Sequence, residues 1–412
     1  MATTFSISPL NHSAGFGASV EGLDLNQLEG ADGVTTSFPQ DSALIRSPMA
    51  DATFEALEKA LYIHKILIIR GQEKLVRWTC LVSVLSTEPA PITQTPTKQL
   101  ELVMRFDPAA KPVHGHGTSK EVLKAFGGKP SLVGANPVPA EPMLRLIGRG
   151  SIPVGHHGVT EPLTLKSGSH KGFHKDVLTD EQLDAGETRF QRWHIDAAFY
   201  RTHPPKVTAL WTHTLPVGPL LTARFDDGSD TTMEVKPGRT AFIDSTQMYE
   251  SLSEKDKAWV DHSRAEYAPS PYQWIQDAKA MGNGFGMESD DLETPLIDLP
   301  SNNPDLVKQY PLVWINPLTG EKALQVHSII VAELFIRTSA DGAETVVDNV
   351  SQVRQILYDL QRPFLKPENI LISPQGEGGD SDTPQSSTQR DMGPESAIKY
   401  TLQEATTQPS PK

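Results

Sequence analysis

The chain has 412 residues, 38% of them apolar and 21% charged, so it can bury a core and is not a wholly disordered protein. Its net charge of −14 disfavours a large nucleic-acid-binding surface, because such surfaces need clustered Lys and Arg. The single cysteine, Cys80, leaves no disulfide framework, and 33 prolines favour strands and turns over a helical bundle. The strongest apolar run, residues 60–69, is too short to span a bilayer, so we expect a cytoplasmic protein without membrane contact.

Residues 1–75 have the pattern of a strand, a helix and a second strand, and we assign them to the N-terminal part of one domain. Residues 15–25 alternate small and apolar side chains and predict a strand. Residues 54–61 place apolar side chains at helical spacing and predict an amphipathic helix. The β-branched run at residues 66–69 predicts a strand buried on both faces.

Residues 76–99 differ in character from their surroundings. An apolar stretch is followed by a linker rich in Pro and Thr. Lengthening a surface loop from about 4 to about 28 residues costs only about 2 kcal/mol, so a fold tolerates such a segment. We therefore expect an atypical surface insertion at 76–99, with the domain continuing over residues 100–373.

Short strand-like runs recur between residues 189 and 311, separated by turn signals. The predicted strands are residues 190–200, 207–214, 232–235, 239–244 and 265–268. The sequence Asp226-Asp-Gly-Ser229 predicts a hairpin turn between two strands, and a capping pattern at Ser253 predicts a helix over 253–260.

The last part of the domain and the end of the chain differ sharply. Residues 311–315 and 323–326 predict a hairpin, and residues 347–360 have helical periodicity. From Pro374 onward the sequence is polar, with few large apolar side chains. We expect residues 374–412 to form a disordered polar tail, because such a composition cannot bury enough surface.

The main candidate for chemistry is Trp193-His194-Ile195-Asp196. In a strand, residues two apart point to the same face, so the His194 imidazole and the Asp196 carboxylate can converge on one ion. With one further histidine, such a pair makes the facial triad of a non-haem Fe(II) site. A buried structural pair is the alternative, because about one His-x-Asp is expected by chance in a chain of this composition.

Other histidines compete for this role. A second His-x-Asp motif, His174-Lys-Asp176, lies in a polar stretch and is predicted to be a loop. His327 ends a predicted strand and is the only late candidate for a third ligand. The remaining pairs lie among Gly and Pro and are predicted to be surface or loop histidines: His114 and His116, and His156 and His157. The glycines of Gly282-Asn-Gly284-Phe-Gly286 lack the strand–turn–helix context of a phosphate loop.

Several segments of the chain together match one family pattern. They are residues 17–25, 64–72, 104–108, 226–228, 314–320 and 361–363, with Arg189-Phe-Gln-Arg-Trp-His-Ile-Asp-Ala-Ala198 as the most specific. On these residues the chain resembles the taurine-dioxygenase-like superfamily of Fe(II)- and 2-oxoglutarate-dependent oxygenases. Within that superfamily it is most similar to the fungal xanthine dioxygenase type.

The resemblance implies a fold, a site and a reaction. The implied fold is mainly β with flanking helices, built around a double-stranded β-helix (jelly roll). His194 and Asp196 are implied to be catalytic residues and the first two iron ligands, and Thr240 to contact 2-oxoglutarate. The implied reaction consumes 2-oxoglutarate and O₂, yields succinate and CO₂, and hydroxylates a small-molecule purine, xanthine to uric acid.

The chain departs from the family pattern at its C-terminal end. The family has its second histidine ligand and a 2-oxoglutarate-binding arginine on late strands, where this chain has a polar tail without histidine. We therefore expect a jelly roll lacking its C-terminal strands, an iron site with two of three protein ligands, and a 2-oxoglutarate without its bidentate Arg contact. We expect one cause for both unusual segments, retained or mis-joined intron sequence. The alternatives are a non-catalytic relative that binds metal or purine, and a jelly roll of another class that binds metal through His194, Asp196 and His327.

Overall fold

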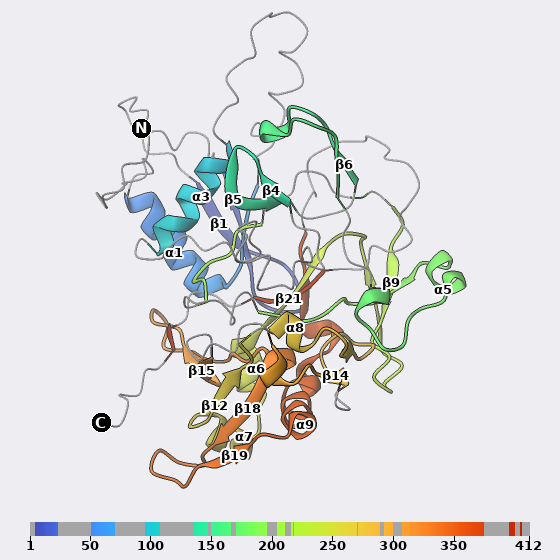
Figure 1. The fold of residues 1–412 in the computed structure, drawn as a ribbon. Coiled ribbons are helices and arrows are strands. Elements are labelled where there is room, and N and C mark those ends of the chain that lie inside the picture. The colour runs from blue at the N-terminus through green and yellow to red at the C-terminus, as the bar shows by residue number, and fades with distance from the viewer. Residues whose placement is uncertain are drawn as a thin grey trace, which may run out of the picture.

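Sheets with flanking helices make up the part of the chain that the computed structural model describes (Figure 1). This agrees with the predicted mainly-β class. The described residues are 5–23, 51–70, 95–107, 136–146, 150–165, 170–195, 204–210, 216, 218–269, 271–288, 292–299, 307–374, 395–399 and 404–405.

The N-terminal sheet has the order β1-β2-β3. Strand β1 (Ser6–Pro9) pairs antiparallel with β2 (Ala18–Glu21), and β2 pairs in parallel with β3 (Leu67–Ile69). Parallel neighbours need a crossover, and helix α1 (Asp51–His64) lies in the connection. The predicted strand, helix and strand of this region are confirmed, although β3 is half-buried and not buried on both faces.

Helix α3 (Thr95–Phe106) lies beside α1 (Figure 1). The rings of Phe54 on α1 and Phe106 on α3 have centroids 4.8 Å apart, and the Arg105 guanidinium lies 4.4 Å from the Phe54 ring. Residues 95–99, the end of the expected insertion, thus form the first turn of α3, and the bounds of the insertion stay a prediction. Pro96 was interpreted as linker sequence, but proline is compatible with the first turn of a helix, where its missing N–H costs nothing. Residues 76–94 lie outside the described part.

A four-stranded antiparallel sheet of order β15-β12-β18-β19 lies at the far end of the molecule from α1 (Figure 1). Helix α9 (Val350–Gln361) packs against β18, and its N-terminus is capped by the Asn349 side chain, which accepts a hydrogen bond from Gln352 N. The strands are β12 (Arg264–Tyr267), β15 (Lys308–Pro311), β18 (Val331–Ile336) and β19 (Thr345–Val347). The predicted strand near residues 265–268 and the predicted helix over 347–360 are confirmed.

Three further sheets have three strands each. The orders are β10-β9-β8, β20-β11-β21 and β17-β16-β22. Their strands, apart from the last two in the chain, are β8 (Glu187–Thr188), β9 (Leu221–Arg224), β10 (Thr232–Val235), β11 (Thr240–Asp244), β16 (Val313–Ile315), β17 (Lys322–Leu324) and β20 (Ile370–Ile372). Both predicted hairpins, β9–β10 and β16–β17, are confirmed by antiparallel pairing.

Smaller elements complete the described chain. Helix α7 (Glu254–Val260) begins after Ser253, whose hydroxyl accepts from Asp256 N, as the capping pattern predicted. The others are β4 (Asn136–Val138), β5 (Glu141–Leu146), β6 (Gly150–Ile152), β7 (Leu163–Leu165), β13 (Lys279–Ala280), β14 (Met287–Glu288), α5 (Asp180–Asp184), α6 (Ser245–Glu250) and α8 (Pro271–Trp274).

Two predicted strands are wrong in their described parts. Residues 190–195 and 207–210 have no strand pairing. At residues 191 and 193 the reason is visible: backbone groups bond to a histidine side chain and to a glycine turn instead of to a neighbouring strand. Strand-like composition here reflects burial of Phe190 and Trp193, not a ladder.

Two short strands are described within the expected tail of residues 374–412. Strand β21 (Glu395–Lys399) pairs in parallel with β11, and β22 (Glu404–Ala405) pairs antiparallel with β16. Strand pairing is made by backbone N–H and C=O groups and does not require apolar side chains. Disorder of the tail as a whole stays a prediction. Residues 375–394 lie outside the described part. No helix among the described residues is both long and apolar enough to cross a bilayer.

Candidate active site

The residues leading to His194 form an irregular segment, residues 189–195, which we call the ligand segment. Its anchor is Trp193, whose side chain is only 2% exposed. The Trp193 backbone N–H donates to Gly284 O at 2.8 Å, and its indole N–H donates to Asn283 O at 3.1 Å. The Phe190 ring packs against the Trp193 and Phe225 rings, at centroid distances of 5.2 and 5.4 Å. The ligand segment is therefore held by burial and by bonds to one distant turn.

That turn, residues 281–286, approaches the ligand segment so closely that Gly284 is required. Gly284 has φ +72, and a Cβ placed there would lie 2.9 Å from Phe190 O and 3.1 Å from Gln191 O. A Cβ at Gly282 would lie 2.8 Å from the Asp226 Cβ. We call residues 281–286 the glycine turn. Sequence reasoning only excluded a phosphate loop here; the repeated glycines were the signal of close backbone approach.

The ligand segment also contacts the loop of residues 170–178, which we call the histidine loop. The His174 Nε2 lies 2.5 Å from Gln191 O, and the ring is only 2% exposed. Burial lowers the pKa of His174 to about 4, and the charges of His170, Arg189 and Arg192 also act to lower it, against the Gln191 hydrogen bond, which raises it. The ring is therefore neutral at pH 7, and its Nε2–H donates to the Gln191 carbonyl.

Further contacts join the histidine loop to the ligand segment and to Ala280, the residue before the glycine turn. The Arg189 guanidinium donates to Asp176 O, and the Arg192 guanidinium lies 4.2 Å from the Phe173 ring. Ala280 N donates to Phe173 O at 2.7 Å, at the edge of the glycine turn. The prediction that His174-Lys-Asp176 is a loop is confirmed, but the burial of His174 was not visible in the sequence.

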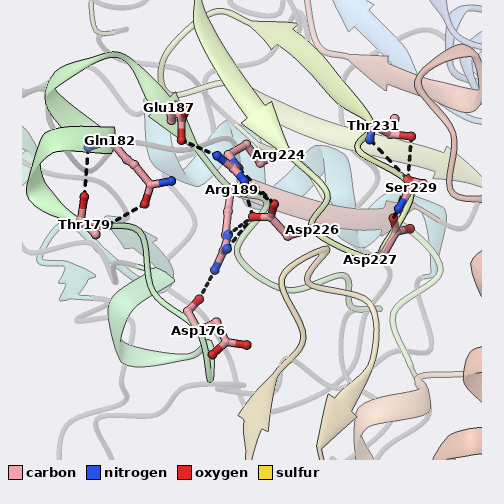
Figure 2. A network of polar contacts seen from close by, with 10 residues as sticks. All are labelled: Asp176, Thr179, Gln182, Glu187, Arg189, Arg224, Asp226, Asp227, Ser229 and Thr231. Atoms are coloured by element: carbon pink, nitrogen blue, oxygen red, sulfur yellow. Dashed lines mark hydrogen bonds and ion pairs between the residues drawn. The ribbon is translucent and has the colours of Figure 1, made fainter.

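An arginine–carboxylate network fixes the start of the ligand segment (Figure 2). Arg189 Nε donates to Asp226 Oδ2 at 2.9 Å, Arg224 Nη2 donates to Asp226 Oδ1 at 2.9 Å, and Arg224 Nη1 donates to Glu187 Oε2 at 2.9 Å. Burial alone would raise the pKa of Asp226, but hydrogen bonds and charge from Arg224 and Arg189 outweigh it, so the pKa lies below its ordinary value. Asp226 stays ionised at pH 7 and joins β9 to the ligand segment.

His194 is half-buried at the end of the ligand segment. Its Nδ1 lies 3.1 Å from Arg192 O, so a metal would be bound through Nε2. A backbone carbonyl on the other ring nitrogen is the usual support of a metal-binding histidine, and the residue fits that role. Asp196 lies outside the described residues. In the described part, no group of three His, Cys, Asp or Glu side chains could hold a metal.

The structure does bring the late histidine beside the early one. The His327 ring is 3% exposed and its centroid lies 6.3 Å from that of His194. Imidazoles on adjacent corners of one metal would have centroids about 4.5 Å apart, given metal–nitrogen bonds of about 2.1 Å. As placed, the two rings are neighbours but do not have the spacing of two facial ligands.

The other predicted site residues are less informative. Thr240 is the first residue of β11 and is 7% exposed, and its contact with 2-oxoglutarate stays a prediction. His156 and His157 lie in a half-buried 3-10 turn, consistent with loop histidines. His114 and His116 lie outside the described residues.

Comparison with known proteins now identifies the chain. Residues 143–367 match the family model "Taurine catabolism dioxygenase TauD, TfdA family". The chain belongs to the TauD/TfdA family. It is therefore a 2-oxoglutarate-dependent dioxygenase, an oxidoreductase, whose cofactor is Fe(II) and whose co-substrate is 2-oxoglutarate. The matched region contains His194 and Thr240.

Two curated relatives cover most of this TauD/TfdA chain. The α-ketoglutarate-dependent xanthine dioxygenase of Emericella nidulans is 36% identical over 376 residues, 90% of this chain and 87% of the relative. That of Neurospora crassa is 34% identical over 380 residues, 90% of this chain and 79% of the relative. Among solved structures, a taurine dioxygenase from Burkholderia xenovorans is 16% identical with a TM-score of 0.38, over 91% of this chain and 77% of that one.

Proposed function

We propose that this dioxygenase hydroxylates a purine, converting xanthine to uric acid. The observation that supports the substrate is that relatives named as xanthine dioxygenases, at 36% and 34% identity, align with 90% of the chain. The reaction balances: one oxygen atom of O₂ enters xanthine, and the other enters the succinate formed, with CO₂, from 2-oxoglutarate.

We propose that His194, through Nε2, and Asp196 hold the iron, and that Thr240 contacts 2-oxoglutarate. Bound Fe(II) supplies the activation of O₂ for substrate oxidation. What the protein contributes in the described residues is support of His194: the Arg192 carbonyl orients its ring, and the glycine turn and histidine loop hold the backbone that precedes it. We also propose that the strands around this site form the jelly roll expected of the family.

We further propose that the iron site lacks its third protein ligand and that 2-oxoglutarate lacks its arginine. Iron then binds weakly, and the co-substrate loses a bidentate contact. Retained or mis-joined intron sequence accounts for this and for the segment at about 76–99. Sequencing the transcript tests it: a cDNA that reproduces both segments in frame would refute this explanation.

The function is tested by measuring succinate formed from 2-oxoglutarate with Fe(II), with and without xanthine. The chain is compared with a version whose residues after Pro374 are replaced by the C-terminal segment of the Emericella nidulans relative. We expect xanthine-dependent succinate from the replaced version and little from the chain as it stands. Full activity in the original chain would refute the missing-ligand proposal. Xanthine binding without succinate in either version would indicate a non-catalytic binding protein, and stimulation by another substrate alone would refute xanthine.

A further inference from the structure

Two consecutive peptide units in the ligand segment are each fastened from outside. The carbonyl of Gln191, in the first unit, accepts from the His174 ring at 2.5 Å. The second unit contains Arg192 C=O and Trp193 N–H, and that N–H donates to Gly284 O at 2.8 Å. The oxygen of this second unit is the one that lies 3.1 Å from His194 Nδ1. The orientation of the His194 ring therefore depends on how these two units are held.

The group that holds the first unit is itself rigid. His174 N donates to His170 O at 2.8 Å, and its ring packs edge-on against that of His170, with centroids 5.8 Å apart. The residues on either side of His174 are both hydrogen-bonded to Ala280, since Ala280 N donates to Phe173 O and Lys175 N donates to Ala280 O at 3.0 Å. A buried ring fixed in this way cannot easily follow a shift of the ligand segment.

We propose that His174 is a positioning residue for the iron site: its hydrogen bond to Gln191 O fixes the backbone from which His194 projects. This inference rests on the proposed role of His194 as an iron ligand. The second His-x-Asp motif of the chain then has a function without being a metal site. Its His174 ring holds the Gln191 carbonyl, and its Asp176 carbonyl oxygen holds Arg189 at the start of the same segment.

Partners that orient a metal-binding histidine typically change metal affinity by about 10- to 100-fold when removed. His174 acts on His194 through one peptide unit and not directly, so we expect the low end of that range, about tenfold. A residue that only stabilised the loop would lower the melting temperature without changing metal affinity of the folded protein.

The test measures Mn(II) binding to the metal-free full chain, from the EPR signal of unbound Mn(II), together with the melting temperature. His174→Phe keeps a ring but removes the donor, and His174→Gln places an amide N–H near the position of Nε2. We expect His174→Phe to weaken Mn(II) binding about tenfold and His174→Gln to stay within about threefold of the wild type. His174→Asn, whose amide is too short to reach Gln191, should resemble His174→Phe even if the latter folds poorly.

The matched control is His170→Phe. His170 is in the same loop and is 3% exposed, and its Nε2 accepts from Leu178 N within the loop. A phenyl ring keeps the edge-on packing against His174, and the bond from His174 N to His170 O is a backbone bond that the substitution leaves in place. This variant loses only the acceptor for Leu178 N, so it should lower the melting temperature and leave Mn(II) affinity unchanged. Equal loss of affinity in His174→Phe and His170→Phe, or equal loss in His174→Phe and His174→Gln, would overturn the positioning role while leaving the iron site standing. A wild-type chain that binds no Mn(II) would overturn the proposed iron site and this inference with it.

Discussion

Gly284→Ala should be strongly destabilising, because Gly284 combines a left-handed backbone with two very close backbone neighbours. An alanine at φ +72 costs about 1 kcal/mol, the lower end of the left-handed penalty. Its Cβ would lie 2.9 Å from Phe190 O and 3.1 Å from Gln191 O, so the glycine turn would have to move away. That movement would weaken both hydrogen bonds from Trp193, at about 1 kcal/mol each. The total loss in unfolding free energy is about 3 kcal/mol.

Gly320→Ala is the matched control for this prediction. Gly320 has nearly the same backbone angle, φ +74, but a Cβ there would have no neighbour within 4 Å. It should lose only the conformational part, about 1 kcal/mol. Urea unfolding at 25 °C of both variants and the wild type measures the difference. If the two variants lose the same stability, the close approach to the ligand segment carries no energy, and the reasoning is refuted.

Four further variants test polar groups of the described residues. The pKa of His174, about 4, lies below that of an unfolded histidine, so the free energy of unfolding should fall as the pH drops from about 6.5 towards 4. His174→Gln should flatten this pH dependence in urea unfolding, and an unchanged pH dependence would contradict the prediction. Arg354 and Glu293 form a salt bridge with side chains 5% and 8% exposed. Glu293→Gln leaves the buried guanidinium unpaired and should lower the free energy of unfolding by about 3 kcal/mol. The double variant Glu293→Leu with Arg354→Met removes both charges and should recover most of that loss. A double variant as unstable as the single one would refute that account. The pKa of Asp226 is below its ordinary value, so the stability that its ionised carboxylate contributes is present at pH 7 and is lost as the pH falls through the lowered pKa. Asp226→Asn should therefore lower the free energy of unfolding at pH 7 and make it depend less on pH in the acid range. A pH dependence equal to that of the wild type would argue against this account.

Most regular elements could be predicted because their signals are local. The capping serine of α7, the Asp-Gly turn of the β9–β10 hairpin and the periodicity of α1 and α9 all lie within a few residues of the element they specify. The N-terminus of α3 was missed although its signal was local too, because Pro96 suits both a linker and a first helical turn. Strand β21 was missed because its pairing with β11 depends on backbone groups far away in the sequence.

The sequence predicted part of the candidate site, and there is a physical reason why it did not predict the rest. The motif around His194 identified the residue type suited to a metal, and the structure gives its ring the backbone support such a ligand needs. The argument for convergence with Asp196 assumed a strand, yet residues 190–195 have no strand pairing. The buried Phe190 and Trp193 gave this segment a strand-like composition, but composition does not say which groups satisfy the backbone.

The contacts that hold the ligand segment could not be predicted from the sequence. Each joins two segments that are far apart in the chain, and neither segment has a motif that suggests catalysis. His174 lies in a polar stretch, and the glycines around Gly284 predict nothing beyond the absence of a phosphate loop. In the structure they hold two neighbouring peptide units of the ligand segment, and His174 lies 17 residues before Gln191, whereas Gly284 lies far after Trp193 in the sequence. Holding a histidine by its preceding backbone requires only one donor and one acceptor, and these need no motif. Such supports are therefore found by asking which groups bond to the backbone N–H and C=O of the residues just before a metal ligand. In this chain that question can be answered for His194, although Asp196 lies outside the described residues.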